Sequence, residues 1–263
     1  MKETVTYPSA NGTNQIVAKI CKPSFAPIKG IVQISHGMCE YIDRYDEFMD
    51  FLLDNNYAVC GNDHLGHGRT AASAEELGFF AEKDGAACLV EDLHTLTGLA
   101  KTAVPGVPLF LLGHSMGSFV ARQYAAQYAD ELAGLIICGT AGPRWINRIS
   151  KVLAAAEIKR IGLRERDILL DQLAFGSFNM RYRDRRTKHD WLSRDREIVD
   201  RYEKDELCMF TFTAGAFRDL FTLLEQVNAD AWFAALDRDL PVYLVSGDMD
   251  PVGGYGKGVS LAG

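Results

Sequence analysis

Short apolar runs alternate with amphipathic segments along most of the chain. The apolar runs predict buried strands at 30–35, 57–60, 107–112, 135–138 and 241–245. Between them, apolar residues recur at helical spacing in three segments, marked by Tyr45, Phe48, Met49 and Leu52, by Leu89, Leu93, Leu96 and Ala100, and by residues 119–125. Asp84 is a candidate N-cap for the second of these helices. Strands that alternate with helices predict an α/β protein, with a mostly parallel central sheet and helices on both faces.

Two further segments modify this pattern. Residues 4–7 and 15–22 predict a hairpin that turns at Asn11-Gly12. Residues 143–236 contain helical and charged sequence without a convincing buried strand, so we expect an insertion over the carboxyl edge of the sheet, where α/β proteins bind ligands. The predicted division is a core of residues 1–142 and 237–263, with a helical cap insertion at 143–236.

Composition narrows the functional class. The chain has 263 residues, 48% of them hydrophobic, which suits one large globular domain with an insertion. Its net charge of −7 disfavours a general nucleic-acid binder. The six cysteines form no C-x-x-C pair or Cys/His cluster, so neither a disulfide framework nor a zinc site is expected. The N-terminus has no signal-like apolar stretch and no segment is long enough to span a membrane. We therefore expect a reduced, cytoplasmic protein without a cofactor or metal.

The sequence Gly113-His114-Ser115-Met116-Gly117 carries the strongest chemical signal. It stands between a predicted strand and a predicted helix, the setting in which G-x-S-x-G forms a nucleophile elbow. Glycines at both ends avoid Cβ atoms that would clash with the strand and the helix. The alternative is an ordinary glycine turn, which the flanking elements disfavour. Ser115 is the predicted nucleophile.

An attacking serine also needs two N–H donors for the developing oxyanion. The Met116 peptide begins the elbow helix and is the first candidate. The second is Met38, in the turn His36-Gly37-Met38 that follows an earlier strand; the less favoured alternative is a plain strand-to-helix connection.

The carboxylate that orients the base should follow the nucleophile in the chain. Asp248 and Asp250 both lie directly after the last predicted strand, and either suits the role. Gly247 and Pro251 would also make this an ordinary turn with capping carboxylates.

Four motifs in this order resemble the monoacylglycerol lipase and lysophospholipase branch of the α/β-hydrolases, also described as serine aminopeptidase S33-like or Hydrolase_4: HGMCEYIDRY, NDHLGHGRT, GHSMGS and SGDMDPVGG. The resemblance implies an α/β-hydrolase fold with Ser115 as nucleophile, Asp250 as triad acid, and Met38 and Met116 as oxyanion donors. It also implies a serine carboxylic-ester hydrolase that acts on a small lipid-like monoacyl ester, with the segment 143–236 as a cap over the acyl pocket. The substrate-binding residues within that cap remain unassigned.

The chain departs from this family in one respect. Only 13 residues follow Asp250, and none is the histidine that would complete the triad. The six histidines, His36, His64, His67, His94, His114 and His189, all lie at other positions; we expect His114 to point into the protein and His189 to belong to a solvated basic face. We expect a truncated chain that lacks the last strand and helix, is inactive or impaired, and self-associates through its exposed sheet edge at 241–245.

The cap contains apolar stripes beside a local basic cluster. Phe217, Leu220, Phe221 and Leu224 share one helical face, and most such residues pack the cap onto itself and the core. The cluster Arg181, Arg183, Arg185, Arg186 and Lys188 fits a solvated face better than a transient membrane-surface site. Two other functions stay open: a non-catalytic ligand-binding protein of the same fold, and an S33-type peptidase. A peptidase that removes N-terminal residues would need a carboxylate for the substrate's amine, and the sequence identifies none.

Overall fold

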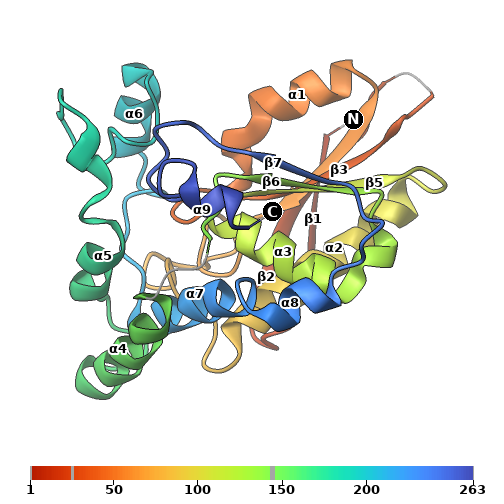
Figure 1. Cartoon of the computed structure of the whole chain (residues 1–263). Coiled ribbons are helices and arrows are strands. Elements are labelled where there is room, and N and C mark those ends of the chain that lie inside the picture. Colours follow the sequence, from red (N-terminus) through yellow and green to blue (C-terminus); the bar gives the residue numbers. More distant parts are fainter. Residues whose placement is uncertain (1, 25–26, 143–145, 263) are drawn as a thin grey trace.

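The computed structural model of the chain describes residues 2–24, 27–142 and 146–262 (Figure 1). A seven-stranded sheet with the order β1-β2-β4-β3-β5-β6-β7 forms the centre of this part. The strands are β1 Lys2–Pro8, β2 Gln15–Cys21, β3 Gly30–Ser35, β4 Tyr57–Asn62, β5 Leu109–His114, β6 Gly134–Cys138 and β7 Val242–Val245. Strand β1 pairs with β2, and β2 pairs with β4, in antiparallel orientation. Every other neighbouring pair of strands is parallel. The predicted strands and the mostly parallel sheet are confirmed.

Helices cover both faces of the sheet, as predicted (Figure 1). These are η1 Ile42–Tyr45, α1 Asp46–Asp54, α2 Gly85–Ala103, α3 Met116–Tyr128 and η2 Ala129–Glu131. Met49 of α1 and Ile42 pack with Val32, Ile34 and Val59 on one face. The other face of the sheet carries the larger core, to which α2 and α3 contribute. Both faces can be buried because strands β3 to β6 are apolar on both sides. Asp84 stands at the N-cap of α2, but its backbone is left-handed and its side chain makes no capping hydrogen bond.

The segment 143–236 is helical in its described part. It contains α4 Ile146–Ile161, α5 Ile168–Phe175, η3 Phe178–Arg181, α6 Arg196–Glu203, α7 Ala214–Gln226 and α8 Asp230–Ala235. The only strand-like pairing among its described residues is one bridge between Arg166 and Thr213. Helices α4 to α6 lie beyond the edge of the sheet, whereas α7 also packs on α2 and α3, and α8 packs on α3 (Figure 1). The predicted boundary at residue 143 falls outside the described residues.

The last strand, β7, lies at the edge of the sheet. Val242, Tyr243 and Val245 are 39, 64 and 38% exposed, so this strand presents apolar side chains to solvent. A short helix, α9 Lys257–Ser260, follows it. None of the described helices is long and apolar enough to cross a membrane.

Candidate active site

A cavity of about 1360 Å³ lies where the parallel strands end, between the sheet and the helices of the segment 143–236. The core lines it with residues 37–40, 114–116 and 246–250, which follow β3, β5 and β7. Parallel strands bring loops that are distant in sequence to one edge of the sheet, and ligands bind there in open α/β sheets. The structure therefore brings together the predicted nucleophile, both predicted oxyanion donors and both candidate acids.

Ser115 occupies a strained turn between β5 and α3. Its φ of 51° and ψ of −120° are unusual for a residue with a side chain, and such strain costs on the order of 1–3 kcal/mol. The Ser115 N–H donates to Cys138 O at 2.9 Å, which fixes the turn against β6. A Cβ on Gly113 would lie 2.5 Å from Gly117 O, and a Cβ on Gly117 would clash with backbone oxygens of Ser35 and His36. The predicted need for glycine at both ends is confirmed.

Both predicted donors line the cavity with Ser115. Met116 is the first residue of α3, so its N–H has no acceptor within the helix. Within the described residues, no backbone acceptor contacts the Met38 N–H either. Gly37 lets the Met38 loop approach closely, because a Cβ there would stand 3.1 Å from Ser115 Cβ. Two backbone N–H groups without a backbone acceptor among the described residues therefore belong to residues that line the cavity with Ser115.

Glu40 connects this loop to the elbow, a role that the sequence analysis missed. Its Oε1 accepts from the Gly37 N–H, from the Tyr45 hydroxyl at 2.8 Å and from His114 Nδ1 at 2.9 Å. Burial opposes ionisation of Glu40, yet the neighbouring His114 and these donors hold its pKa at about 2. Burial alone would lower the pKa of His114, but the charge of Glu40, with a smaller contribution from Asp250, raises it. Each of the two groups thus favours the charged form of the other.

The prediction for His114 was wrong in one respect. Its ring does not turn away into the protein but lines the cavity, with 39% of the side chain exposed, because Glu40 draws Nδ1 towards the loop. His189 is also misjudged: it lines the same cavity, and its Nδ1 bonds Glu203 Oε1 at 2.9 Å. His94, by contrast, pairs with Glu131 on the outer side of α2.

The two candidate acids lie in different environments. Asp248 forms an ion pair with Arg194 in which both side chains are about 80% exposed. Asp250 accepts from Ser246 Oγ and from the Val252 N–H, each at 2.9 Å. A Cβ on Gly139 would lie 3.3 Å from Asp250 Oδ2 and 4.0 Å from His114 Nε2, so Asp250 stands near the elbow. The geometry favours Asp250 over Asp248 as the site carboxylate.

The remaining histidines pack together behind the cavity. His36, His64 and His67 are fully buried, with ring centroids 4.4 Å apart for His36 and His64 and 5.2 Å apart for His36 and His67. His36 and His67 each accept a backbone N–H at Nε2, from His64 and Cys39 respectively. Burial lowers the pKa of all three. In the described part of the chain, no group of three His, Cys, Asp or Glu side chains is arranged to hold a metal ion.

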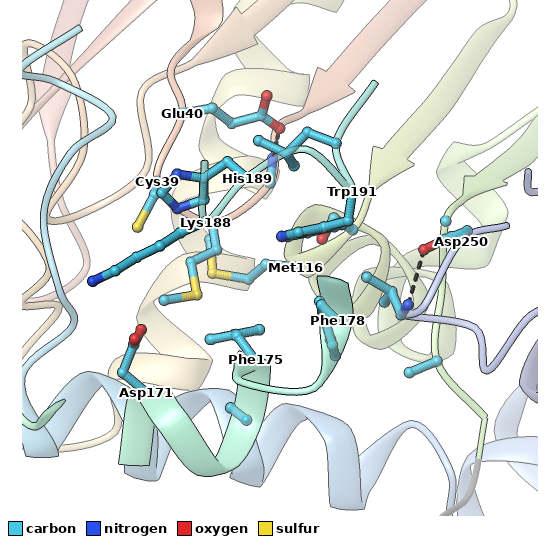
Figure 2. A pocket seen from close by; sticks show the side chains of 18 of the residues that line it. Cys39, Glu40, Met116, Asp171, Phe175, Phe178, Lys188, His189, Trp191 and Asp250 are labelled. Carbon is cyan, nitrogen blue, oxygen red and sulfur yellow. Dashed lines mark hydrogen bonds between the residues drawn. The ribbon is translucent and has the colours of Figure 1, made fainter. Parts of the chain in front are cut away.

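The segment 143–236 contributes both apolar and charged walls to the cavity. Phe175 and Phe178 line it, and so do Leu220, Phe221 and Leu224 from the predicted stripe. Lys188 of the basic cluster and Asp171 lie on the side opposite Asp250 (Figure 2). Burial raises the pKa of Asp171, against the opposing charge of Lys188. Asp171 does not stand out in the sequence as a pocket residue, because isolated charges on amphipathic helices usually face solvent, and Lys188 was assigned with its basic cluster to a solvated face.

Comparisons with known proteins identify the family of this chain. The family model described as "Serine aminopeptidase, S33" (Hydrolase_4) matches residues 26–262. A monoacylglycerol lipase of Mycolicibacterium smegmatis is 30% identical over 250 residues, which cover 92% of this chain and 79% of that protein. The monoglyceride lipase of Rattus norvegicus is also 30% identical, over 189 residues that cover 71% of this chain and 54% of its own length.

Solved structures show the same fold. A thermostable carboxyl esterase of Bacillus coagulans, crystallised in complex with glycerol, superposes with a TM-score of 0.92 and 31% identity, covering 99% of this chain and 84% of that one. A lipase in an open form superposes with a TM-score of 0.87 and 26% identity, with the same coverage. The chain belongs to the serine aminopeptidase S33 (Hydrolase_4) family of α/β-hydrolases, in its monoacylglycerol lipase-like branch.

Proposed function

We propose that this protein is a serine carboxylic-ester hydrolase whose substrates are small monoacyl lipid esters. The observation that carries the proposal is Ser115, held on a strained elbow that opens into a large cavity with aromatic and aliphatic walls. The cavity exceeds the usual volume of a small-molecule site, about 300–1,000 Å³, and leaves room for an acyl chain beside a headgroup. The lipase and esterase relatives support this substrate class.

Catalysis would proceed through an acyl-serine intermediate. Ser115 Oγ attacks the ester carbonyl carbon, and the carbonyl oxygen becomes an oxyanion that accepts from the Met38 and Met116 N–H groups. Collapse of this adduct breaks the bond to the alcohol oxygen, which leaves with a proton. Water then attacks the acyl carbon and releases the fatty acid, which restores the serine hydroxyl.

Asp250 is the proposed triad acid, because it lies beside the elbow and Asp248 does not. The base that takes the proton of Ser115 must be neutral. His114 is unsuited to this role, since Glu40 and Asp250 raise its pKa and favour the imidazolium.

The segment 143–236 is the proposed cap. Its helices α4 to α6 supply the cavity wall that faces the strand ends, and α5 lines it with Leu170, Asp171 and Phe175. Helices α7 and α8 would anchor the cap on α2 and α3.

A fluorophosphonate probe tests the proposal, used on protein expressed from the complete reading frame. We expect one labelled serine, and Ser115→Ala should abolish the label, whereas Ser118→Ala, three residues along α3, should keep it. Absence of labelling, or labelling that survives Ser115→Ala, would refute a serine hydrolase. Stabilisation by a monoalkyl glycerol ether without any labelling would instead favour the non-catalytic ligand-binding protein.

A second candidate is a peptidase that removes N-terminal residues. Asp171 favours it, because this half-buried carboxylate faces the cavity and would attract a substrate ammonium. The two functions separate when a monoacyl p-nitrophenyl ester and a set of amino-acid p-nitroanilides are assayed side by side. We expect hydrolysis of the ester only, and turnover of the anilides that Asp171→Asn removes would reverse the assignment.

The proposal also includes transient contact with a membrane surface and self-association of the protein. Val152, Ile168, Leu169 and Leu173 on α4 and α5 are 48–70% exposed, which would suit transient contact with a membrane surface. The exposed apolar strand β7 would favour self-association. The six cysteines are free, as a reducing cytoplasmic compartment requires. Vesicle co-sedimentation of Ile168→Asp and gel filtration of Tyr243→Lys, each against wild type, test the first two points.

A further inference from the structure

The segment 181–194 lies against the loop that carries Asp250, and three contacts join the two stretches. The Tyr182 hydroxyl donates to Met249 O at 2.7 Å. The Arg194 guanidinium donates to Asp248 Oδ1 at 2.7 Å. The Arg181 guanidinium lies 3.6 Å from the centroid of the Tyr255 ring. We call residues 246–255 the acid loop.

Bonds inside the acid loop fix the carboxylate relative to the loop itself. The Asp250 N–H donates to Gly247 O at 3.2 Å, and the Tyr255 N–H donates to Asp250 O at 2.9 Å. Ser246 Oγ and the Val252 N–H hold the two carboxylate oxygens. These bonds do not set how the loop as a whole sits against the cavity, so contacts with the cap contribute to that placement.

Of the three contacts, the hydrogen bond from Tyr182 to Met249 O restrains Asp250 most directly. Its acceptor, Met249 O, belongs to the peptide that joins Met249 to Asp250, so the bond restrains the orientation of that peptide. The Arg194–Asp248 pair is about 80% exposed on both sides, and exposed pairs contribute little. Tyr182 is half-buried, and burial raises the pKa of its phenol, which keeps the hydroxyl protonated and able to donate.

We propose that Tyr182 is a positioning residue that ties the acid loop to the cap, so that Asp250 is correctly placed only while the segment 181–194 is seated. Because Tyr182 also lines the cavity, an acyl substrate contacts the same residue that restrains the loop. The order of the cap and the alignment of the carboxylate are thereby coupled. The inference rests on the proposed role of Asp250.

The test replaces one hydroxyl and keeps the ring. Tyr182→Phe is compared with Tyr128→Phe, which removes a part-buried tyrosine bond of the same length, 2.7 Å to Glu91 Oε1, outside the cavity. For a short p-nitrophenyl ester, Tyr182→Phe should lower kcat about tenfold, as loss of alignment does, while KM stays within about twofold. Hydrogen exchange of the Asp250 and Tyr255 amides should become about fivefold faster, because the loop opens more often. Tyr128→Phe should change neither quantity.

Each other outcome overturns the inference. An unchanged kcat with unchanged exchange in the acid loop would mean that the Tyr182 bond restrains nothing. A raised KM with unchanged kcat would make Tyr182 a wall of the cavity only. Should the wild-type protein fail to hydrolyse esters, the proposed function fails, and the exchange measurement still decides whether Tyr182 ties the loop to the cap.

Discussion

Acidification should destabilise this protein because three fully buried histidines must stay neutral. His36 and His67 each use Nε2 to accept a backbone N–H, and Nδ1 of each lies within 2.9 Å of a backbone carbonyl oxygen. Both rings are therefore satisfied as the neutral Nδ1–H tautomer, and an added proton on Nε2 would face an N–H donor. Burial lowers the pKa of His67 to about 3 and that of His64 well below its usual value.

Whether acid stabilises or destabilises the fold depends on which state, folded or unfolded, binds more protons. His64 and His67 take up a proton near pH 6.5 when the chain is unfolded but remain neutral in the fold between pH 7 and pH 5. Below pH 6.5 the free energy of unfolding therefore falls by about 1.4 kcal/mol per pH unit for each of these two histidines. Between pH 7 and pH 5 the loss is about 2 kcal/mol for each, or about 4 kcal/mol for the two, and His36, whose pKa burial also lowers, adds to this loss.

Two buried carboxyl groups act in the opposite direction. Burial raises the pKa of Asp92 and of Asp219 to about 6, so each binds its proton more tightly in the fold. Together they raise the free energy of unfolding by about 3 kcal/mol between pH 7 and pH 5. The expected net loss is therefore at least about 1 kcal/mol, against a typical stability of about 5–15 kcal/mol. The melting temperature should fall by at least about 3 °C.

Urea unfolding at half-unit steps from pH 7.5 to pH 5 measures this slope. His67→Gln should flatten it by about 1.4 kcal/mol per pH unit, whereas His94→Gln on the outer side of α2 serves as the matched control and should keep it. A wild-type stability that is flat or rises on acidification would refute the reasoning. So would a His67→Gln variant that retains the full slope.

Three further predictions concern the site. Gly117→Ala should destabilise the fold by about 3 kcal/mol in chemical unfolding, because its Cβ would clash with the rigid backbone oxygens of Ser35 and His36, whereas Gly98→Ala meets no atom within 4 Å and should be tolerated. Asp250→Asn should lower kcat for esters about 10⁴-fold while the exposed Asp248→Asn stays within about threefold; similar losses for both would contradict the assignment of Asp250. Glu40→Gln should lower the pKa of His114, measured by NMR titration of its ring protons, because the paired charge is removed. An unchanged titration of His114 would disprove the ion pair.

Hydrophobic periodicity and turn residues were enough to predict the central sheet and the helices that flank it. Buried parallel strands are apolar on both faces, so runs such as 30–35 and 135–138 stand out without any neighbouring information. The elbow was equally predictable, because Cβ clashes require glycine at positions 113 and 117, on either side of the serine. Signals that are local in sequence thus placed Ser115, Met116 and the Met38 loop.

Features that depend on distant partners were not predictable in this way. Glu40 looked like an ordinary loop residue, and its partner His114 lies 74 positions later. Tyr182 and its acceptor Met249 are 67 positions apart in the sequence, and their contact depends on how the segment 143–236 folds back over the sheet. Asp84 had the right residue type for a capping side chain, yet its left-handed backbone leaves it without that bond. Local propensity contains no information about such pairings.

The interaction of Glu40 with His114 gives one physical reason why the Met38 and Met116 residues both lie at the cavity beside Ser115. The Met38 N–H belongs to the loop after β3, and the Met116 N–H to the turn after β5. Glu40 accepts from Gly37 within the first segment and from His114 within the second, so a single carboxylate binds both. An apolar residue at position 40 would leave the Gly37 N–H unpaired and the two segments free to separate. The charge of Glu40 thus aligns backbone groups that would otherwise depend on packing alone.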